Sequence, residues 1–167
     1  MKKWNSGKLL LTAAVALIID MASKWFVAHM MFPNESRPLI GDFVRITLVR
    51  NTGSAFGFFS GQRTTLIVIS VVAILLLGYL IVRSRERSYL SMISLGLVLG
   101  GALGNLVDRV RVGRVIDFLD VGFGRHRWPV FNFADACVTV GVAILAVSLY
   151  TGGEKAAGKR SEKESLS

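Results

Sequence analysis

Four aspartates in the second half of the chain combine a residue type suited to acid–base chemistry with an unusual setting. Asp108, Asp117, Asp120 and Asp135 lie between or inside two long apolar runs of the sequence. A carboxylate at the centre of a hydrocarbon layer costs roughly 2.5–3.5 kcal/mol on insertion scales. A sequence that keeps such residues is therefore expected to use them.

The sequence neighbours of the aspartates single out two of them. Asp117 lies in Val-Ile-Asp-Phe-Leu and Asp135 in Phe-Ala-Asp-Ala-Cys, and neither has an adjacent cation. Two poorly solvated carboxyl groups can share one proton, as in aspartic proteases. One carboxylate of such a pair takes a proton from water, while the protonated partner donates to the carbonyl oxygen of the bond that is cleaved. We predict that Asp117 and Asp135 form this pair.

The other acidic residues have basic neighbours that can neutralise them. Asp20 lies four residues before Lys24, so the two share a helical face. Asp108 is followed directly by Arg109, and Arg111 is close, which predicts an ion pair that holds a helix end. Asp120 is expected to be a loop residue at the rim of the site.

The composition indicates a membrane protein. The 167 residues are 52% hydrophobic and have a mean hydropathy of +0.53, which is typical of several membrane-spanning segments. The net charge of +9 comes from basic residues at the ends of apolar runs, where they suit anionic lipid headgroups. We therefore expect membrane lipids as partners and no nucleic acid.

Cysteine and histidine give no sign of a disulfide or a metal site. Cys137 is the one cysteine, so an internal disulfide is excluded, and its place in an apolar run predicts a buried core residue. His29 and His126 lie far apart in the sequence. We expect neither a metal nor an organic cofactor.

The apolar runs predict an all-α membrane protein with four transmembrane helices and a small extracytoplasmic β-sheet. Prolines interrupt the segment after the first span, and the alternating residues 43–50 predict a strand followed by a turn at residues 51–59. Residues 1–151 are expected to form a single membrane domain, and residues 152–167 a disordered cytoplasmic tail. The predicted spans are about 9–31, 64–82, 88–107 and 128–150, with the sheet or loop at 33–63.

The distribution of lysine and arginine predicts the orientation of these spans. Basic residues gather at the N-terminus, between the second and third spans and in the tail, so both termini are expected in the cytoplasm. Residues 33–63 and 108–127 then face outward, together with the aspartates. The second of these loops carries more basic residues than the rule favours, namely Arg109, Arg111, Arg114, Arg125 and Arg127.

Five short blocks of polar residues occur along the chain in a specific order. They are Asp20-x-x-x-Lys24, Asn51-x-Gly-x-Ala-Phe56, Gly104-Asn-x-x-Asp108-Arg109, Val115-Ile-Asp117-Phe and Phe131-Asn-x-Ala-Asp135. With these blocks the chain resembles, over roughly residues 9–150, the lipoprotein signal peptidases (signal peptidase II), which are bacterial membrane aspartyl endopeptidases.

The resemblance implies roles for individual residues. Asp117 and Asp135 match the catalytic aspartates of the family. Polar residues of its substrate and inhibitor site are matched by Asn51, Asn105 and Arg109. Gly53, in the same block as Asn51, allows close approach of a substrate backbone. Supporting motif positions are matched by Asp20, Lys24, Asp108, Asn132 and Ala134.

The resemblance also implies a substrate and a place of action. The enzyme would remove the signal peptide of a diacylglyceryl-modified prolipoprotein, just before the lipidated cysteine, at the outer face of the bacterial plasma (inner) membrane. It would act as a monomer.

Spacing alone leaves a second hypothesis open. Intramembrane aspartates also relay protons, so Asp20, Asp108 and Asp135 could serve a small proton-coupled transporter or channel subunit. A transporter would move protons or solute across reconstituted vesicles without cutting any peptide.

Overall fold

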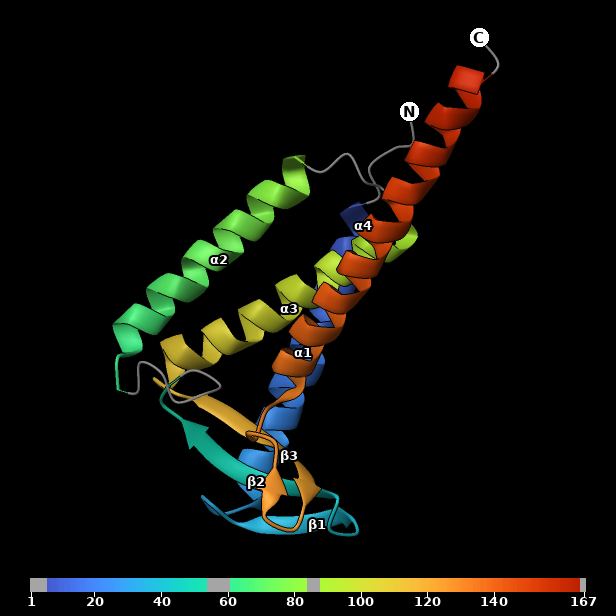
Figure 1. Ribbon diagram of the computed structural model, residues 1–167. Helices are drawn as coiled ribbons and strands as arrows, with labels where there is room; N and C mark the ends of the chain where they lie inside the picture. The colour runs from blue at the N-terminus through green and yellow to red at the C-terminus, as the bar shows by residue number, and fades with distance from the viewer. Residues whose placement is uncertain (1–5, 54–60, 84–87, 166–167) are drawn as a thin grey trace.

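The computed structural model describes residues 6–53, 61–83 and 88–165, which form four helices and a four-stranded sheet. The sheet lies at one end of the helices, and α2 stands to one side of the other three (Figure 1). The second sequence block is described only in part, because Ala55 and Phe56 lie outside these ranges, as does most of the predicted turn. The elements are α1 (Ser6–Met30), β1 (Ser36–Ile40), β2 (Val44–Asn51), α2 (Arg63–Arg83), α3 (Tyr89–Arg111), β3 (Val115–Phe123), β4 (His126–Arg127) and α4 (Phe133–Ser165).

Three of the described helices are long and apolar enough to cross a membrane. They are residues Gly7–Met30 of α1, α2, and α3, whereas α4 carries a shorter apolar segment, Phe133–Ser148. The mostly helical membrane fold with a small sheet is thus confirmed. That α4 makes a fourth span stays a prediction.

The helix boundaries differ from the predicted spans in three places. The third helix continues past residue 107 to Arg111, so it includes Asp108 and Arg109. The fourth begins at Phe133 instead of Trp128. It also continues to Ser165, through residues expected to be disordered, in a stretch rich in Ala, Glu and Lys, which favour helix.

The sheet joins two segments that are far apart in the sequence. The predicted strand is confirmed as β2, and it pairs antiparallel with β1 on one side and β3 on the other. Strand β3 lies in the segment that we expected to be an outer loop. In its register Val49 is opposite Asp117 and Asn51 is opposite Val115. The end of β2 therefore comes next to Asp117.

An apolar cluster fixes the sheet to the end of α1. Val27 and Met31 pack there against Leu48 of β2 and Phe118 of β3. Because Phe118 directly follows Asp117, this contact fixes the strand that carries the aspartate.

Glycines of α3 allow the other helices to approach closely. A side chain at Gly96 would meet the backbone of Leu9 in α1, at 2.7 Å from its carbonyl oxygen. One at Gly101 would meet the backbone of Ala134 in α4, and one at Gly104 would meet the carboxylate of Asp20. The glycines thus place polar groups of three helices next to one another.

We expect Gly104→Ala to destabilise the protein and to reduce cleavage, because the added methyl group displaces the carboxylate of Asp20. Overpacking of this kind costs about 1–3 kcal/mol. The matched control is Gly78→Ala in α2, where no atom of the described residues lies within 4 Å of the added carbon apart from the neighbouring backbone of α2 itself. Thermal unfolding in detergent should give a lower Tm for the first variant and an equal or higher Tm for the second. Equal Tm values for the two would contradict the packing argument.

Candidate active site

Asp135 is held by the start of its own helix. Asn132 precedes α4 as its N-cap, and its Oδ1 accepts a hydrogen bond from the backbone N–H of Asp135 at 3.0 Å. In return, Oδ2 of Asp135 accepts from the backbone N–H of Asn132 at 3.2 Å. These reciprocal bonds form a capping box. The other carboxylate oxygen accepts from Nδ2 of Asn105 at 2.8 Å.

Asp117 is buried in β3 between two amide donors. Its Oδ1 accepts from Nδ2 of Asn132 at 2.7 Å, and its Oδ2 accepts from Nδ2 of Asn51 at 2.9 Å. Asn51 is oriented in turn by the backbone N–H of Gly53, which donates to its Oδ1 at 2.8 Å. Asn132 thus contacts both predicted catalytic aspartates, although they lie on different elements.

Burial raises the pKa of Asp117 to about 6. The hydrogen bond from Asn51 acts in the opposite direction, because it stabilises the carboxylate, and so does the bond from Asn132. The negative charge of Asp135 acts in the same direction as burial, and the pKa of about 6 is the net result of these opposing effects. At pH values below about 6, Asp117 therefore carries a proton that it can donate.

Lys24 lies at the centre of a buried cluster behind the aspartates. Its Nζ contacts Oδ2 of Asp20 at 2.8 Å and Oδ2 of Asp108 at 3.0 Å. The predicted pairing of Asp20 with Lys24 is confirmed. The predicted pairing of Asp108 with Arg109 is wrong: Lys24 reaches Asp108 across the interface of α1 and α3, which sequence spacing does not reveal. Only 2% of the Lys24 side chain is exposed.

Lys24 also orients the amides that contact the aspartates. An ammonium group can only donate, and the third contact of Nζ is to Oδ1 of Asn105 at 3.0 Å. Nδ2 of Asn105 consequently faces Asp135. Asn132 also donates its Nδ2 to Oδ1 of Asn105, at 3.1 Å. Both aspartates therefore receive N–H donors.

Asp20 connects α1 to the start of α4. Its Oδ1 accepts from the backbone N–H of Ala134 at 2.9 Å, one of the helix N-terminal groups that lack a partner within the helix. Ala134 is fully buried. Its part in the site is carried by its backbone.

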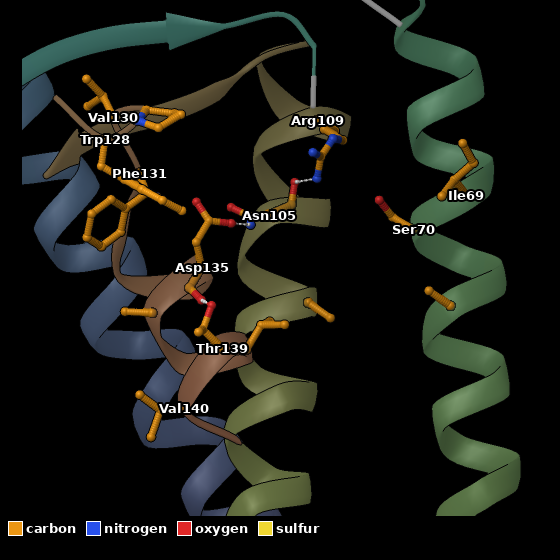
Figure 2. Close-up of a pocket in the computed structure, with 15 residues that line it drawn as sticks. Ile69, Ser70, Asn105, Arg109, Trp128, Val130, Phe131, Asp135, Thr139 and Val140 are labelled. Atoms are coloured by element: carbon orange, nitrogen blue, oxygen red, sulfur yellow. Dashed lines mark hydrogen bonds between the residues drawn. The ribbon is translucent and has the colours of Figure 1, made fainter. Parts of the chain in front are cut away.

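A pocket of about 730 Å³ opens between α2 and α4, over α3. Figure 2 shows Asp135, Asn105 and Arg109 along one side, with Ser70 of α2 across from them. Arg109 donates to the backbone carbonyl of Asn105 at 3.3 Å. The lining is largely apolar and comprises Ile69, Ser70, Ala73, Ala102, Asn105, Arg109, Trp128, Pro129, Val130, Phe131, Asp135, Ala136, Val138, Thr139 and Val140.

The site residues predicted from the sequence fall into two groups, those that line the pocket and those that lie behind its lining. Asp135, Asn105 and Arg109 line the pocket, whereas Asp117, Asn51 and the lysine cluster lie outside its lining. The α2 wall was missed by sequence reasoning. The feature of the sequence that could have indicated this wall is Ser70, a polar residue in an apolar run.

Asp120 is a buried residue of β3, not a loop acid at the rim. Thr47 of β2 donates to it at 2.8 Å, and the guanidinium of Arg127 donates to its other oxygen at 2.6 Å. These bonds connect β3 to the elements on both sides.

No group of three or more His, Cys, Asp or Glu side chains within residues 6–53, 61–83 and 88–165 is arranged to hold a metal ion. Cys137 is buried, as predicted.

Comparison with known proteins gives consistent matches. Residues 12–151 match the family model described as signal peptidase (SPase) II. A lipoprotein signal peptidase of Syntrophus aciditrophicus (strain SB) is 41% identical over 145 residues, which cover 84% of this chain and 90% of the relative. One from Staphylococcus aureus (strain MRSA252) is 32% identical over 163 residues, or 98% of each chain. A bacterial membrane enzyme solved by the in meso method at 2.3 Å resolution superimposes with a TM-score of 0.84, at 33% identity, covering 92% of this chain and 94% of the other.

Proposed function

Since this chain belongs to the signal peptidase II family, we propose that Asp117 and Asp135 are the catalytic pair with which it acts. Its activity is the removal of signal peptides from prolipoproteins. The proposal adds that the substrate carries diacylglyceryl on a cysteine, and that cleavage falls just before this cysteine at the outer face of the plasma membrane.

The contact of Asn132 with both carboxyl groups is the observation that carries the proposal. Its Nδ2 donates to Asp117, while its backbone N–H donates to Asp135. One residue thus ties the carboxyls of β3 and α4 into a single hydrogen-bond network next to the pocket. Two carboxyls in such a network are suited to share one proton.

The different surroundings of the two carboxyls suggest their roles. Asp117 is buried and its pKa is about 6, so it suits the protonated acid that donates to the carbonyl oxygen. Asp135 faces the pocket, where it takes a proton from the attacking water. The water oxygen bonds to the carbonyl carbon and gives a tetrahedral diol. When the C–N bond breaks, Asp135 returns its proton to the leaving nitrogen and Asp117 recovers its own from the diol.

The pocket suits a substrate that stays in the membrane. It lies between α2 and α4 and is mainly apolar, and polar groups gather where Asp135 and Asn105 face it. We propose that α4 is a fourth span through its apolar segment Phe133–Ser148, with both termini cytoplasmic and the sheet outside. Arg109 and Asn51 would hold the substrate backbone, and one chain would suffice.

Incubation of the purified protein with a diacylglyceryl-modified prolipoprotein tests the proposal. We expect a loss of mass equal to the signal peptide, with the lipidated cysteine as the new N-terminus by mass spectrometry. The same prolipoprotein without diacylglyceryl serves as the control and should be cleaved much more slowly. Cleavage at another bond, or equal cleavage of both forms, would contradict the proposed specificity.

Asn51→Ala should impair cleavage and change its pH dependence. In the native protein kcat/KM should decrease as the pH rises through about 6, because Asp117 loses the proton that it donates. Asn51 lowers the pKa of Asp117 through its hydrogen bond, so its removal raises that pKa and moves the decrease to higher pH. The measurement is kcat/KM over a pH series, with Tm recorded for both proteins. A lower Tm with unchanged activity per folded molecule would instead assign Asn51 to packing.

A further inference from the structure

Helix α2 forms one wall of the pocket but is only loosely packed. Only 11% of its apolar window is buried inside the protein, against 44% for α3. Figure 1 shows α2 leaning away from the other helices. Within the described residues, the position of this wall, which contributes Ile69, Ser70 and Ala73, therefore depends on a small number of contacts.

Arg63, the first residue of α2, makes two of these contacts. Its Nε donates to the backbone carbonyl of Arg109 at 3.0 Å, and its Nη2 donates to that of Val110 at 2.6 Å. Both carbonyls belong to the last turn of α3, and that of Arg109 also accepts from the backbone N–H of Gly113 at 3.2 Å. A positive charge is also favourable at a helix C-terminus. The guanidinium thus joins the start of α2 to the end of α3.

The absence of a side chain at Gly113 leaves room for the side chain of Arg63. Gly113 follows α3 with a φ of +77°, and a side chain there would lie 3.2 Å from Cδ of Arg63. The contact also lies beside the site, because the side chain of Arg109 lines the pocket with Asp135. Arg63 itself touches neither aspartate in any bond described for it; its bonds go to the backbone of α3.

We propose that Arg63 is a positioning residue that holds the outer end of α2 against α3 and so sets the width of the pocket beside Asp135. The role in catalysis rests on the proposed function of that pocket. Loss of the contact lets α2 move away from α4, which weakens substrate binding and leaves the aspartates and their hydrogen bonds in place. The effect should therefore fall on KM and not on kcat.

The geometric part is tested with Arg63→Gln in spin-labelled protein. Labels at Val68 in α2 and Val142 in α4 suit the measurement, because both side chains are more than half exposed and neither lines the pocket. The buried Cys137 is replaced by Ala in every sample. In bicelles, we expect pulsed electron–electron double resonance to give a longer and broader distribution of distances between the two labels for Arg63→Gln than for the native protein. Arg63→Lys, which keeps a charged donor but not the two-pronged geometry, should lie between it and the native protein.

Kinetics with a diacylglyceryl-modified prolipoprotein give the second readout. For Arg63→Gln we expect KM to rise about tenfold, equivalent to about 1.4 kcal/mol, with kcat within about twofold. The control is Arg83→Gln at the other end of α2, an exposed residue with no hydrogen bond or ion pair among the described parts of the chain. It should change neither distance nor KM.

Unchanged distances and an unchanged KM in Arg63→Gln would overturn the proposal, as would a fall in kcat at constant KM. If the proposed function itself were wrong, a different set of results would be expected. In that case Asp135→Asn would cleave normally, while Arg63→Gln would still widen the distance between α2 and α4.

Discussion

Asp117→Asn and Asp135→Asn are each expected to reduce cleavage by about 10³-fold or more, since a positioned acid or base contributes 10²–10⁴-fold. The amide has nearly the shape of the carboxyl group, but it can neither give nor accept the proton that we propose the two aspartates share. The measurement is the single-turnover cleavage rate per folded molecule. Near-normal turnover by either variant would remove that residue from the mechanism.

The two variants should differ in stability. In the native protein, Nδ2 of Asn51 and Nδ2 of Asn132 each donate to one oxygen of Asp117. In Asp117→Asn, the new side-chain nitrogen replaces one of these oxygens and therefore faces a donor that it cannot accept from. An unsatisfied buried group of this kind costs about 1–3 kcal/mol. Asp135→Asn also places an amide nitrogen against a donor, but Asp135 is only half-buried and lines the pocket, so it should be less destabilised.

Asp120→Asn is the matched control for both variants. Asp120 is also a buried aspartate of β3, but its carboxylate contacts Thr47 and Arg127, away from the pocket. The substitution should lower Tm and leave cleavage per folded molecule unchanged. A loss of activity as large as that of Asp117→Asn would mean that any disturbance of β3 inactivates the enzyme.

Lys24→Met should destabilise the protein by about 3–5 kcal/mol, the typical cost of removing one partner of a buried ion pair. Two carboxylates, those of Asp20 and Asp108, lose their partner at once. Activity per folded molecule should fall as well, because Oδ1 of Asn105 loses one of its two donors and keeps only Nδ2 of Asn132, so its amide is held less firmly toward Asp135. Chemical unfolding in detergent and a cleavage assay on the same preparation measure the two effects.

Lys8→Met provides the comparison on the same helix. Lys8 is exposed and lies over the ring of Tyr89 at 4.3 Å from its centroid. A contact of this kind at an exposed site contributes about 0.5–1 kcal/mol. If Lys24→Met were no more destabilising than Lys8→Met, the buried cluster would not support the site in the way described.

The residues that the sequence proposed for the site do lie together in the structure, but the partners of their side chains were harder to predict. Local spacing was sufficient for Asp20 and Lys24, which lie one helical turn apart. It failed for Asp108, because the lysine that pairs with it comes from another helix. Contacts between distant segments depend on helix packing, which the close approach at the glycines of α3 decides.

Strand β3 was missed for a related reason. Alternation of apolar and polar residues predicts a strand whose polar side faces water. In β3 the aspartates are buried, and hydrogen bonds from other segments satisfy them. A strand whose buried residues are polar does not follow the pattern. The space between α2 and α4 could not be predicted either. The composition of an apolar helix does not show which other helices it packs against.

The capping box at the start of α4 limits how the protein can mutate under selection by an active-site inhibitor. Asp135 accepts from the N–H of Asn132, and Asn132 in turn caps the helix and contacts Asp117. A compound that binds these two side chains therefore touches atoms that the helix itself requires. Substitutions of Asn132 or Asp135 that abolish such binding would also remove the helix cap. Resistance should therefore arise first at pocket residues that do not cap the helix, such as Ser70 and Thr139.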